Sequence, residues 1–475
     1  FLVSLVSLRA LRGYAMRLTW ALAVVLVLKT NWGIGMMAMP YLLKESGTVA
    51  GIVLFLVSLV MITDSCLKVG AAQKALRECF SSVDKVSMEA QQVISLDLKT
   101  RLLTVSQDAA TVTDTPINSE DPSPDASSHE EDGERSPNLT TYVGIMEAGV
   151  GLWAARLAMG CISLGSVGSC IAYLRFIADN VNACFGVKAW KTLAVCGALL
   201  APSQMLRDLR NFTFVSFFGV TFGVVFITLL VIKASELSPE HVLHKVSHST
   251  LLKLESFPIG MGIAAFSSEG VIIIWPQVAH SLHLQNMSTM KAKSVVCTSM
   301  GIFALFYVVV GCCGYLIYGD DSLAEISVNM TKGTKHAVIT ANEVAALAYA
   351  VTLLLTFIIV SHLLYTAYEP YAEQHISVST GLKRYLPAIF TAIRCIFPFV
   401  CGGIAYLIPN FGAFLSLLGA LMNSAVIYFL PNLLFLKVVD SSCFQRSWAR
   451  FMLSYALCTA LVGTYASLVK MSSKS

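Results

Sequence analysis

Charged side chains are scarce in this chain of 475 residues: Asp, Glu, Lys and Arg together make up 13% of it, whereas hydrophobic residues make up 56%. The mean hydropathy is +0.69, and apolar runs of membrane-spanning length recur along most of the sequence. The net charge of +4 is small, and the charged residues gather between apolar runs. This distribution excludes a nucleic-acid-binding face. The composition predicts an all-α polytopic membrane protein in contact with the lipid bilayer.

Motifs of soluble enzymes are also lacking. The sequence contains no Walker phosphate loop and no Gly-x-Ser-x-Gly nucleophile elbow. The 13 cysteines lie mostly inside apolar runs, where a thiol behaves as a small apolar side chain, and they do not form a disulfide framework. We therefore expect no enzyme activity, no metal and no cofactor. Any transport by this chain would use ion gradients rather than ATP hydrolysis.

Apolar runs near 20 residues predict about eleven membrane spans. Spans 1 to 5 and 6 to 10 would be two structural repeats, and span 11 would be appended to them. The expected spans are 18–43, 49–71, 151–177, 190–206, 212–232, 257–279, 295–318, 338–365, 386–408, 411–436 and 451–469. In domain terms these are a tail (1–17), spans 1 and 2 (18–77), an insert (78–141), spans 3 to 10 (142–436) and span 11 with its tail (437–475).

Lysine and arginine near the span ends favour a cytosolic N-terminus, which makes residues 1–17 a cytosolic or interfacial tail. The insert 78–141 contains acidic runs such as 119–125 and 130–134. Such a stretch buries too little apolar surface to offset its ordering entropy. We expect cytosolic disorder here, with a short amphipathic helix around 86–103. A tolerated loop insertion is a simpler interpretation of the insert than a regulatory module.

Span 1 is interrupted by glycine and polar residues, from Asn31 through Gly33, Ile34 and Gly35 to Met36. Glycine permits unusual backbone angles and lets a ligand approach the backbone. Unwinding here would expose N–H groups at the start of the half-helix from Met36, where the positive end of the helix dipole suits a carboxylate. The alternative is close helix packing, for which glycine is common in membrane spans.

A second interruption, in span 6, reads Phe266, Ser267, Ser268, Glu269 and Gly270. A matched pair of interruptions in the two halves of a chain points to a transporter's substrate site. An acidic residue inside the membrane costs roughly 2.5–3.5 kcal/mol on insertion scales and is usually found facing a cavity or a partner. Glu269 could therefore bind the coupling proton or the ammonium group of a substrate. The structural alternative is a permanent brace between the two half-helices.

Other polar residues lie close to these interruptions along the sequence or in neighbouring spans. Lys29 precedes the first break by one turn, so it would either hold a fixed charge beside the site or snorkel to the membrane surface. In span 3, Tyr173 could reach a central pocket, whereas Arg175 and Asp179 suit an interface or a gate. In span 8, hydroxyls such as Thr352 could serve a cation or bond to their own backbone.

Several stretches together resemble the amino acid/auxin permease family. Residues 28–41 are similar to its Gly-x-Gly-Ile-Leu-Ala-(Leu/Met)-Pro signature, with a Lys-x-Asn typical of the proton-coupled animal branch. Residues 170–180, 266–270 and 408–412 are similar to further motifs of that branch. The resemblance implies a leucine-transporter-type inverted repeat of five plus five spans with spans 1 and 6 broken, and amino acids as substrates.

We interpret the chain as a secondary active transporter of small neutral amino acids, coupled to protons and working by alternating access as a monomeric unit. The expected substrate-binding residues are Asn31, Gly33, Ile34, Gly35, Met36, Tyr173, Phe266, Ser267 and Ser268, and the expected proton-coupling residues are Glu269 and Lys29. Coupling to sodium, and an amino-acid sensor that signals through the insert, remain alternatives. The membrane would be the plasma membrane or that of an acidic organelle such as a vacuole or lysosome.

Overall fold

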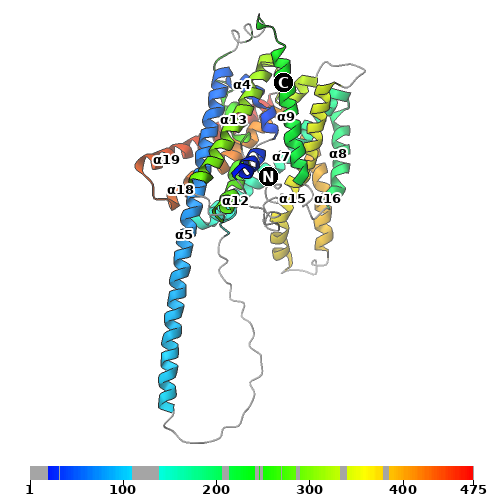
Figure 1. Cartoon of the computed structure of the whole chain (residues 1–475). Coiled ribbons are helices and arrows are strands. Elements are labelled where there is room, and N and C mark those ends of the chain that lie inside the picture. The colour runs from blue at the N-terminus through cyan, green and yellow to red at the C-terminus, as the bar shows by residue number, and fades with distance from the viewer. Residues whose placement is uncertain are drawn as a thin grey trace.

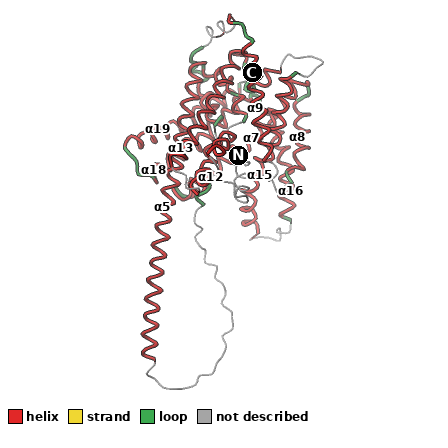
Figure 2. Tube along the Cα trace, in the orientation of Figure 1, coloured by secondary structure: helices red, strands yellow, loops and turns green. Residues whose placement is uncertain are grey.

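The structure is a computed structural model that describes residues 20–30, 33–109, 138–205, 213–240, 245, 250–268, 270–284, 289–331, 340–377 and 385–473. Within these residues the regular structure is entirely helical (Figure 2). Eight helical segments are long and apolar enough to cross a membrane. The prediction of an all-α polytopic membrane protein is therefore confirmed, while the count of eleven spans stays a prediction.

The predicted spans 1 to 5 each coincide with helix, as expected where a bilayer cannot satisfy backbone polar groups. Span 1 is divided into three short helices, and a separate short helix, α6, precedes span 3. The helices are α2 (Trp20–Thr30), α3 (Ile34–Met37), α4 (Met39–Ser46), α5 (Thr48–Ala109), α6 (Tyr142–Gly149), α7 (Leu152–Phe185), α8 (Ala189–Ser203) and α9 (Thr213–Ser235).

Spans 6 to 11 also coincide with helix. Span 6 is divided into α11 and α12, and the last two spans contain wider π-helical turns. The elements are α11 (Phe257–Phe266), α12 (Gly270–Leu284), α13 (Thr289–Tyr318), the 3₁₀ turn η2 (Gly319–Asp321), α14 (Ile326–Thr331), α15 (Ala341–Ser377), α16 (Leu386–Leu407), α17 (Phe411–Leu418), π-helical η4 (Gly419–Asn423) and η5 (Ala425–Phe429), α18 (Leu430–Val438), α19 (Cys443–Cys458), π-helical η6 (Thr459–Gly463) and α20 (Thr464–Ser472).

Helix α5 is much longer than span 2 required. It continues to Ala109 and extends beyond the other helices (Figure 1). The expectation of disorder from residue 78 is therefore wrong for the part up to Ala109, whereas the helix expected around 86–103 lies within α5. Residues 71–115 contain neither glycine nor proline, so nothing in the local sequence stops the helix. The remainder of the insert up to residue 137 lies outside the described residues.

Eight of the predicted spans pack in two groups. Helices of spans 1 and 2 (α2, α4, α5) contact those of spans 6 and 7 (α11, α12, α13), and those of spans 3 and 4 (α7, α8) contact spans 8 and 9 (α15, α16). Each group thus joins spans of the first five with their counterparts in the second five, as a five-plus-five repeat would.

Spans 6 and 10 lie deepest in the bundle: 76% and 72% of their most apolar windows are buried, against 28% for span 9. Their close contact depends on glycine. A Cβ atom at Gly419 would lie 1.9 Å from the carbonyl oxygen of Gly262, and one at Gly262 would lie 2.3 Å from that of Ser416. Small residues at such crossings let two helix backbones approach. This packing fixes α11, which carries the second break.

Candidate functional site

The first interruption lies between α2 and α3. Helix α2 ends at Thr30, and Gly33 has an extended backbone, with φ −151° and ψ −165°, before α3 begins at Ile34. The predicted break in span 1 is confirmed. Asn31 lies outside the described residues, and so does the side chain of Lys29, so the roles expected for both stay predictions.

The second half of span 1 begins at Ile34 and is wholly buried in its first turn. Ile34, Gly35 and Met36 are all buried. The N–H group of Met36 donates to the carbonyl of Gly33 at 3.1 Å, and Ala38 forms a tight turn between α3 and α4. Gly33 has no side chain that could cap the first turn. The N–H groups that precede Met36 in this half-span therefore receive no side-chain cap from Gly33.

The second interruption lies between α11 and α12, as predicted. Helix α11 ends at Phe266, and Ser267 and Ser268 form a turn before α12 begins at Gly270. Both serines are buried. Within the described part of the chain the Ser268 hydroxyl has no hydrogen-bond partner, an arrangement that is costly without a ligand or water. Glu269 lies outside the described residues, so its coupling role stays a prediction.

The two interruptions are in direct contact. A Cβ atom at Gly35 would lie 2.7 Å from the Cα atom of Ser267, so only glycine fits there. The Ser267 hydroxyl donates to the carbonyl of Ile263 at 2.8 Å and, more weakly, to that of Gly35 at 3.5 Å. At Gly33, by contrast, a Cβ atom would meet none of the described residues within 4 Å. The breaks thus touch at Gly35 and leave space at Gly33.

Two tyrosines that the sequence did not single out belong to the same place. The hydroxyl of Tyr307, on α13, donates to the carbonyl of Ser267 at 3.5 Å and lies beside backbone groups of Gly33. The hydroxyl of Tyr349, on α15, lies close enough to Tyr307 to interact with it electrostatically. Tyr349 is 2% exposed and its hydroxyl has no hydrogen-bond partner. Two buried hydroxyls without partners, those of Ser268 and Tyr349, therefore flank the breaks.

Phe266 and Tyr173 are the residues expected to bound the substrate side chain, and their contacts with the two breaks are less direct. Phe266 is buried at the end of α11, with its backbone nitrogen against Gly419 of span 10. Tyr173 on α7 is half-buried and packs against the core. One turn along α7, Phe176 makes an edge-to-face contact with Tyr349, their ring centroids 5.7 Å apart. Span 3 is thus connected to the site through Phe176.

Three hydroxyls of span 8 already donate hydrogen bonds within the protein. Those of Thr352 and Thr356 donate to backbone carbonyls one turn earlier, and that of Ser361 donates to the side chain of Gln204. Arg394 forms a bidentate ion pair with Glu369, at 2.6 and 2.5 Å. No cluster of metal-ligating side chains occurs among the described residues.

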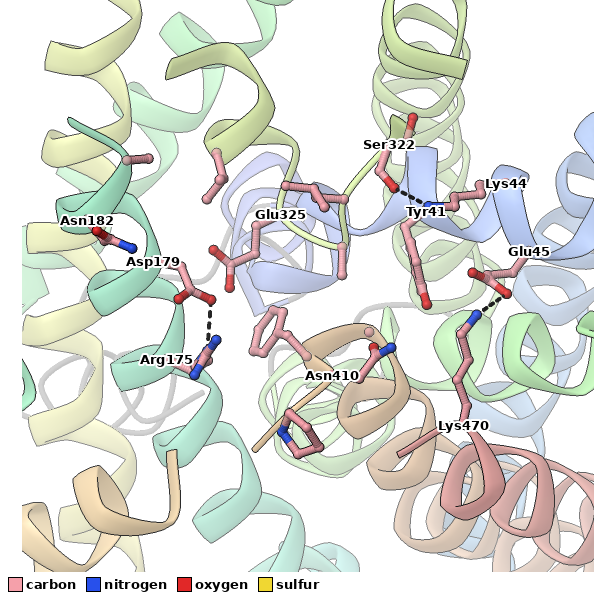
Figure 3. Close-up of a pocket in the computed structure, with 17 residues that line it drawn as sticks. Tyr41, Lys44, Glu45, Arg175, Asp179, Asn182, Ser322, Glu325, Asn410 and Lys470 are labelled. Carbon is pink, nitrogen blue, oxygen red and sulfur yellow. Dashed lines mark hydrogen bonds and ion pairs between the residues drawn. The ribbon is translucent and has the colours of Figure 1, made fainter. Parts of the chain in front are cut away.

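A separate cavity of about 460 Å³ lies at the end of the bundle away from the extension of α5. We call it the outer cavity, because the predicted orientation places it on the non-cytosolic side. Figure 3 shows two ion pairs in it: Arg175 with Asp179 at 2.8 Å, and Lys470 with Glu45 at 2.6 Å. The interface or gate role expected for Arg175 and Asp179 stays a prediction. Its other lining residues include Tyr41, Lys44, Ser322, Glu325 and Asn410.

Two broken spans that meet inside a helical membrane bundle are the arrangement of secondary transporters. The family described as transmembrane amino acid transporter protein matches residues 126–472. The chain belongs to this family, and the resemblance seen in its motifs is confirmed. The match includes the break in span 6, whereas the break in span 1 precedes it.

Individual relatives are more distant. The chain is 21% identical to amino acid transporter AVT1E of Arabidopsis thaliana over 354 residues, which cover 71% of this chain and 63% of the relative. It is 24% identical to AVT1C of the same plant over 353 residues, covering 71% and 60%. With AVT3C, also of Arabidopsis thaliana, the identity is 26% over 215 residues, covering 45% and 44%. The chain spans about three fifths of the length of the first two relatives.

Proposed function

We propose that the chain is a secondary active transporter of small neutral amino acids that works by alternating access around the two breaks. The substrate carboxylate would accept hydrogen bonds from N–H groups between Gly33 and Met36, and its ammonium group would bind carbonyls of both breaks. Phe266 and Tyr173 would bound the substrate side chain. Family membership and the names of the relatives support amino acids as the substrate class.

The contact between Gly35 and Ser267 is the observation that supports this proposal most. Simple helix packing also accounts for a glycine at that contact, but it does not account for the rest of the site. Packing gives no reason for the extended backbone at Gly33, the space beside it, or the unpartnered hydroxyl of Ser268. A small zwitterion seated between the breaks would use all three.

Protons are the proposed coupling ion, with Glu269 as the group that binds and releases them. A fixed ammonium on Lys29 beside the break would disfavour a second cation there. Span 8 gives sodium little support, because the hydroxyls of Thr352 and Thr356 are already engaged with their own helix. Protonating Glu269 would remove a charge from a low-dielectric site and ease closure over the substrate.

A sensor that signals through the insert is the second candidate. The extension of α5 beyond the other helices favours it, because a long helix outside the bundle can report a change at the site to a partner (Figure 1). The two functions differ in one respect that can be measured. A sensor need not move its ligand across the membrane.

The test is uptake of labelled amino acids into liposomes that contain the purified chain, with proton and sodium gradients imposed separately. The proposal predicts uptake of small neutral amino acids driven by an inward proton gradient and unchanged when choline replaces sodium. Uptake that needs sodium would overturn the coupling. Binding without any uptake would favour the sensor.

A further inference from the structure

A buried carboxyl group lies beside the outer cavity, apart from the two breaks. Glu325 sits between η2 and α14, in a connection where acidic side chains are usually exposed. It is 3% exposed. One carboxyl oxygen, Oε2, accepts a hydrogen bond from the side-chain amide of Asn180 at 3.3 Å, and the other, Oε1, has no partner among the residues that the structure describes. An ionised carboxylate held in this way would be poorly compensated.

The groups that face Glu325 from α7 are Arg175 and Asp179, and Figure 3 shows its carboxyl group directed toward Asp179. Arg175 donates to Asp179 at 2.8 Å and to the carbonyl of Ala405 at 3.4 Å. Its positive charge is therefore already matched by Asp179. An ionised Glu325 would add a second negative charge to a pair that is neutral.

The remaining charges around the outer cavity have partners of their own. Lys470 pairs with Glu45 at 2.6 Å, and Lys44 donates to the carbonyl of Ser322 at 3.2 Å. In η2, Asp320 pairs with Lys253 at 2.8 Å, and Asp321 is exposed. On α15, which packs against α14, Glu343 accepts hydrogen bonds from Thr340, and Cys184 of α7 lies beside Thr331 of α14.

We propose that Glu325 is a proton-binding residue of the outer gate: when protonated it stays seated on α7 and keeps the outer cavity closed, and when ionised it leaves and the cavity opens. The moving part would be the connection from Ser322 to Thr331, which α7 and α15 hold in place. This inference rests on the proposed function, because a gate that closes on protonation would link an outside proton to alternating access.

The direction of the effect follows from the environment of the carboxyl group. Burial raises the pKa of Glu325 well above its ordinary value, Asp179 raises it further, and Arg175 opposes this. A group whose pKa is raised in the closed state stabilises that state at low pH. This contribution is lost as the pH rises through the raised pKa. The outer cavity should therefore be closed in acid and open at neutral or alkaline pH.

The experiment measures how fast a cysteine in the cavity reacts with a methanethiosulfonate reagent. Val328→Cys is a suitable reporter, because Val328 lines the cavity and is 7% exposed. Leu254→Cys, at a residue that is 74% exposed, is the matched control for the effect of pH on thiol reactivity. Purified full-length protein is labelled between pH 5 and pH 8. The unmodified chain gives the background from its 13 native cysteines.

The ratio of the Val328→Cys rate to the Leu254→Cys rate should fall as the pH falls. This fall in the ratio can reach at most about tenfold for each unit by which the pKa of Glu325 differs between the closed and open states. With Glu325→Gln, which mimics the protonated form, the ratio should be low at every pH. Asp321→Asn, which removes an exposed acid from the same connection, should keep the wild-type profile. Asp179→Asn should move the midpoint to lower pH.

A wild-type ratio that does not change with pH, or a Glu325→Gln protein that keeps the wild-type profile, would overturn the proposal. Folding of Glu325→Gln is checked by thermal unfolding. If it does not fold, Asp179→Asn tests the proposal instead: a midpoint at lower pH supports the gate, and an unchanged midpoint overturns it. Failure of the proposed function is distinguishable, because it appears as absent amino acid uptake in liposomes. Proton-driven uptake with a flat labelling ratio would leave coupling at Glu269 and refute only the gate.

Discussion

Replacing Gly35 by alanine would place a methyl group 2.7 Å from the Cα atom of Ser267. This is closer than the Cβ atom of a folded protein comes to a non-bonded atom. The obstructing atom belongs to the backbone, so it cannot rotate away and the two breaks must move apart. Overpacking of this kind costs about 1–3 kcal/mol, whereas alanine gains up to about 1 kcal/mol in helix propensity. We expect a net destabilisation of about 1–2 kcal/mol and a severe loss of transport.

Gly33→Ala is the matched control. It introduces the same methyl group two residues earlier, where nothing lies within 4 Å and the extended backbone suits any residue. Thermal unfolding in detergent should rank Gly35→Ala below both Gly33→Ala and wild type. Uptake in liposomes should be lost for Gly35→Ala, and its thermal stabilisation by substrate should disappear. Gly33→Ala serves as a control for stability alone, because its methyl group would enter the space proposed for the substrate. Equal stability of the two variants would refute the close contact between the breaks.

Three further outcomes are expected. Ser268→Ala removes an unpartnered buried hydroxyl, so stability should be unchanged or slightly higher, while KM for the amino acid should rise several-fold through the loss of about 0.5–1.5 kcal/mol of hydrogen bonding; an unchanged KM would mean that this hydroxyl does not meet the substrate. Removing residues 108–135 should leave liposome uptake within a few-fold of wild type, because their composition supports no packed core; loss of uptake in a folded protein would favour the sensor. Glu269→Gln should abolish proton-driven accumulation while substrate exchange continues, and accumulation by this variant down a pH gradient would remove Glu269 from the coupling step.

The two breaks were predictable because glycine, serine and glutamate are conspicuous in otherwise apolar runs. The positions of Gly33 and Ser267 in the sequence were sufficient to locate them. Tyr307 and Tyr349 were missed, since a single tyrosine in an apolar span carries no sign of which neighbour its hydroxyl faces. Only the packing of α13 and α15 against the breaks determines that.

Other errors have a different origin. The extension of α5 was not predictable from the average composition of the insert 78–141, because its two parts differ in sequence. Its first part, up to Ala109, has the helix-compatible sequence that its acidic second part lacks. Glu325 gave no signal, since an acidic residue in a connection between spans is ordinarily solvated. Its burial depends on the seating of that connection on α7.

The most direct test of the account is protection of the site by substrate. A cysteine at Gly33, introduced as Gly33→Cys, would occupy the space beside the breaks, and its rate of modification can be measured against the background of the native chain. The account predicts that a small neutral amino acid carried by this protein slows that modification, while an amino acid that is not carried leaves it unchanged. Modification at the same rate with and without a transported amino acid would show that the substrate binds elsewhere.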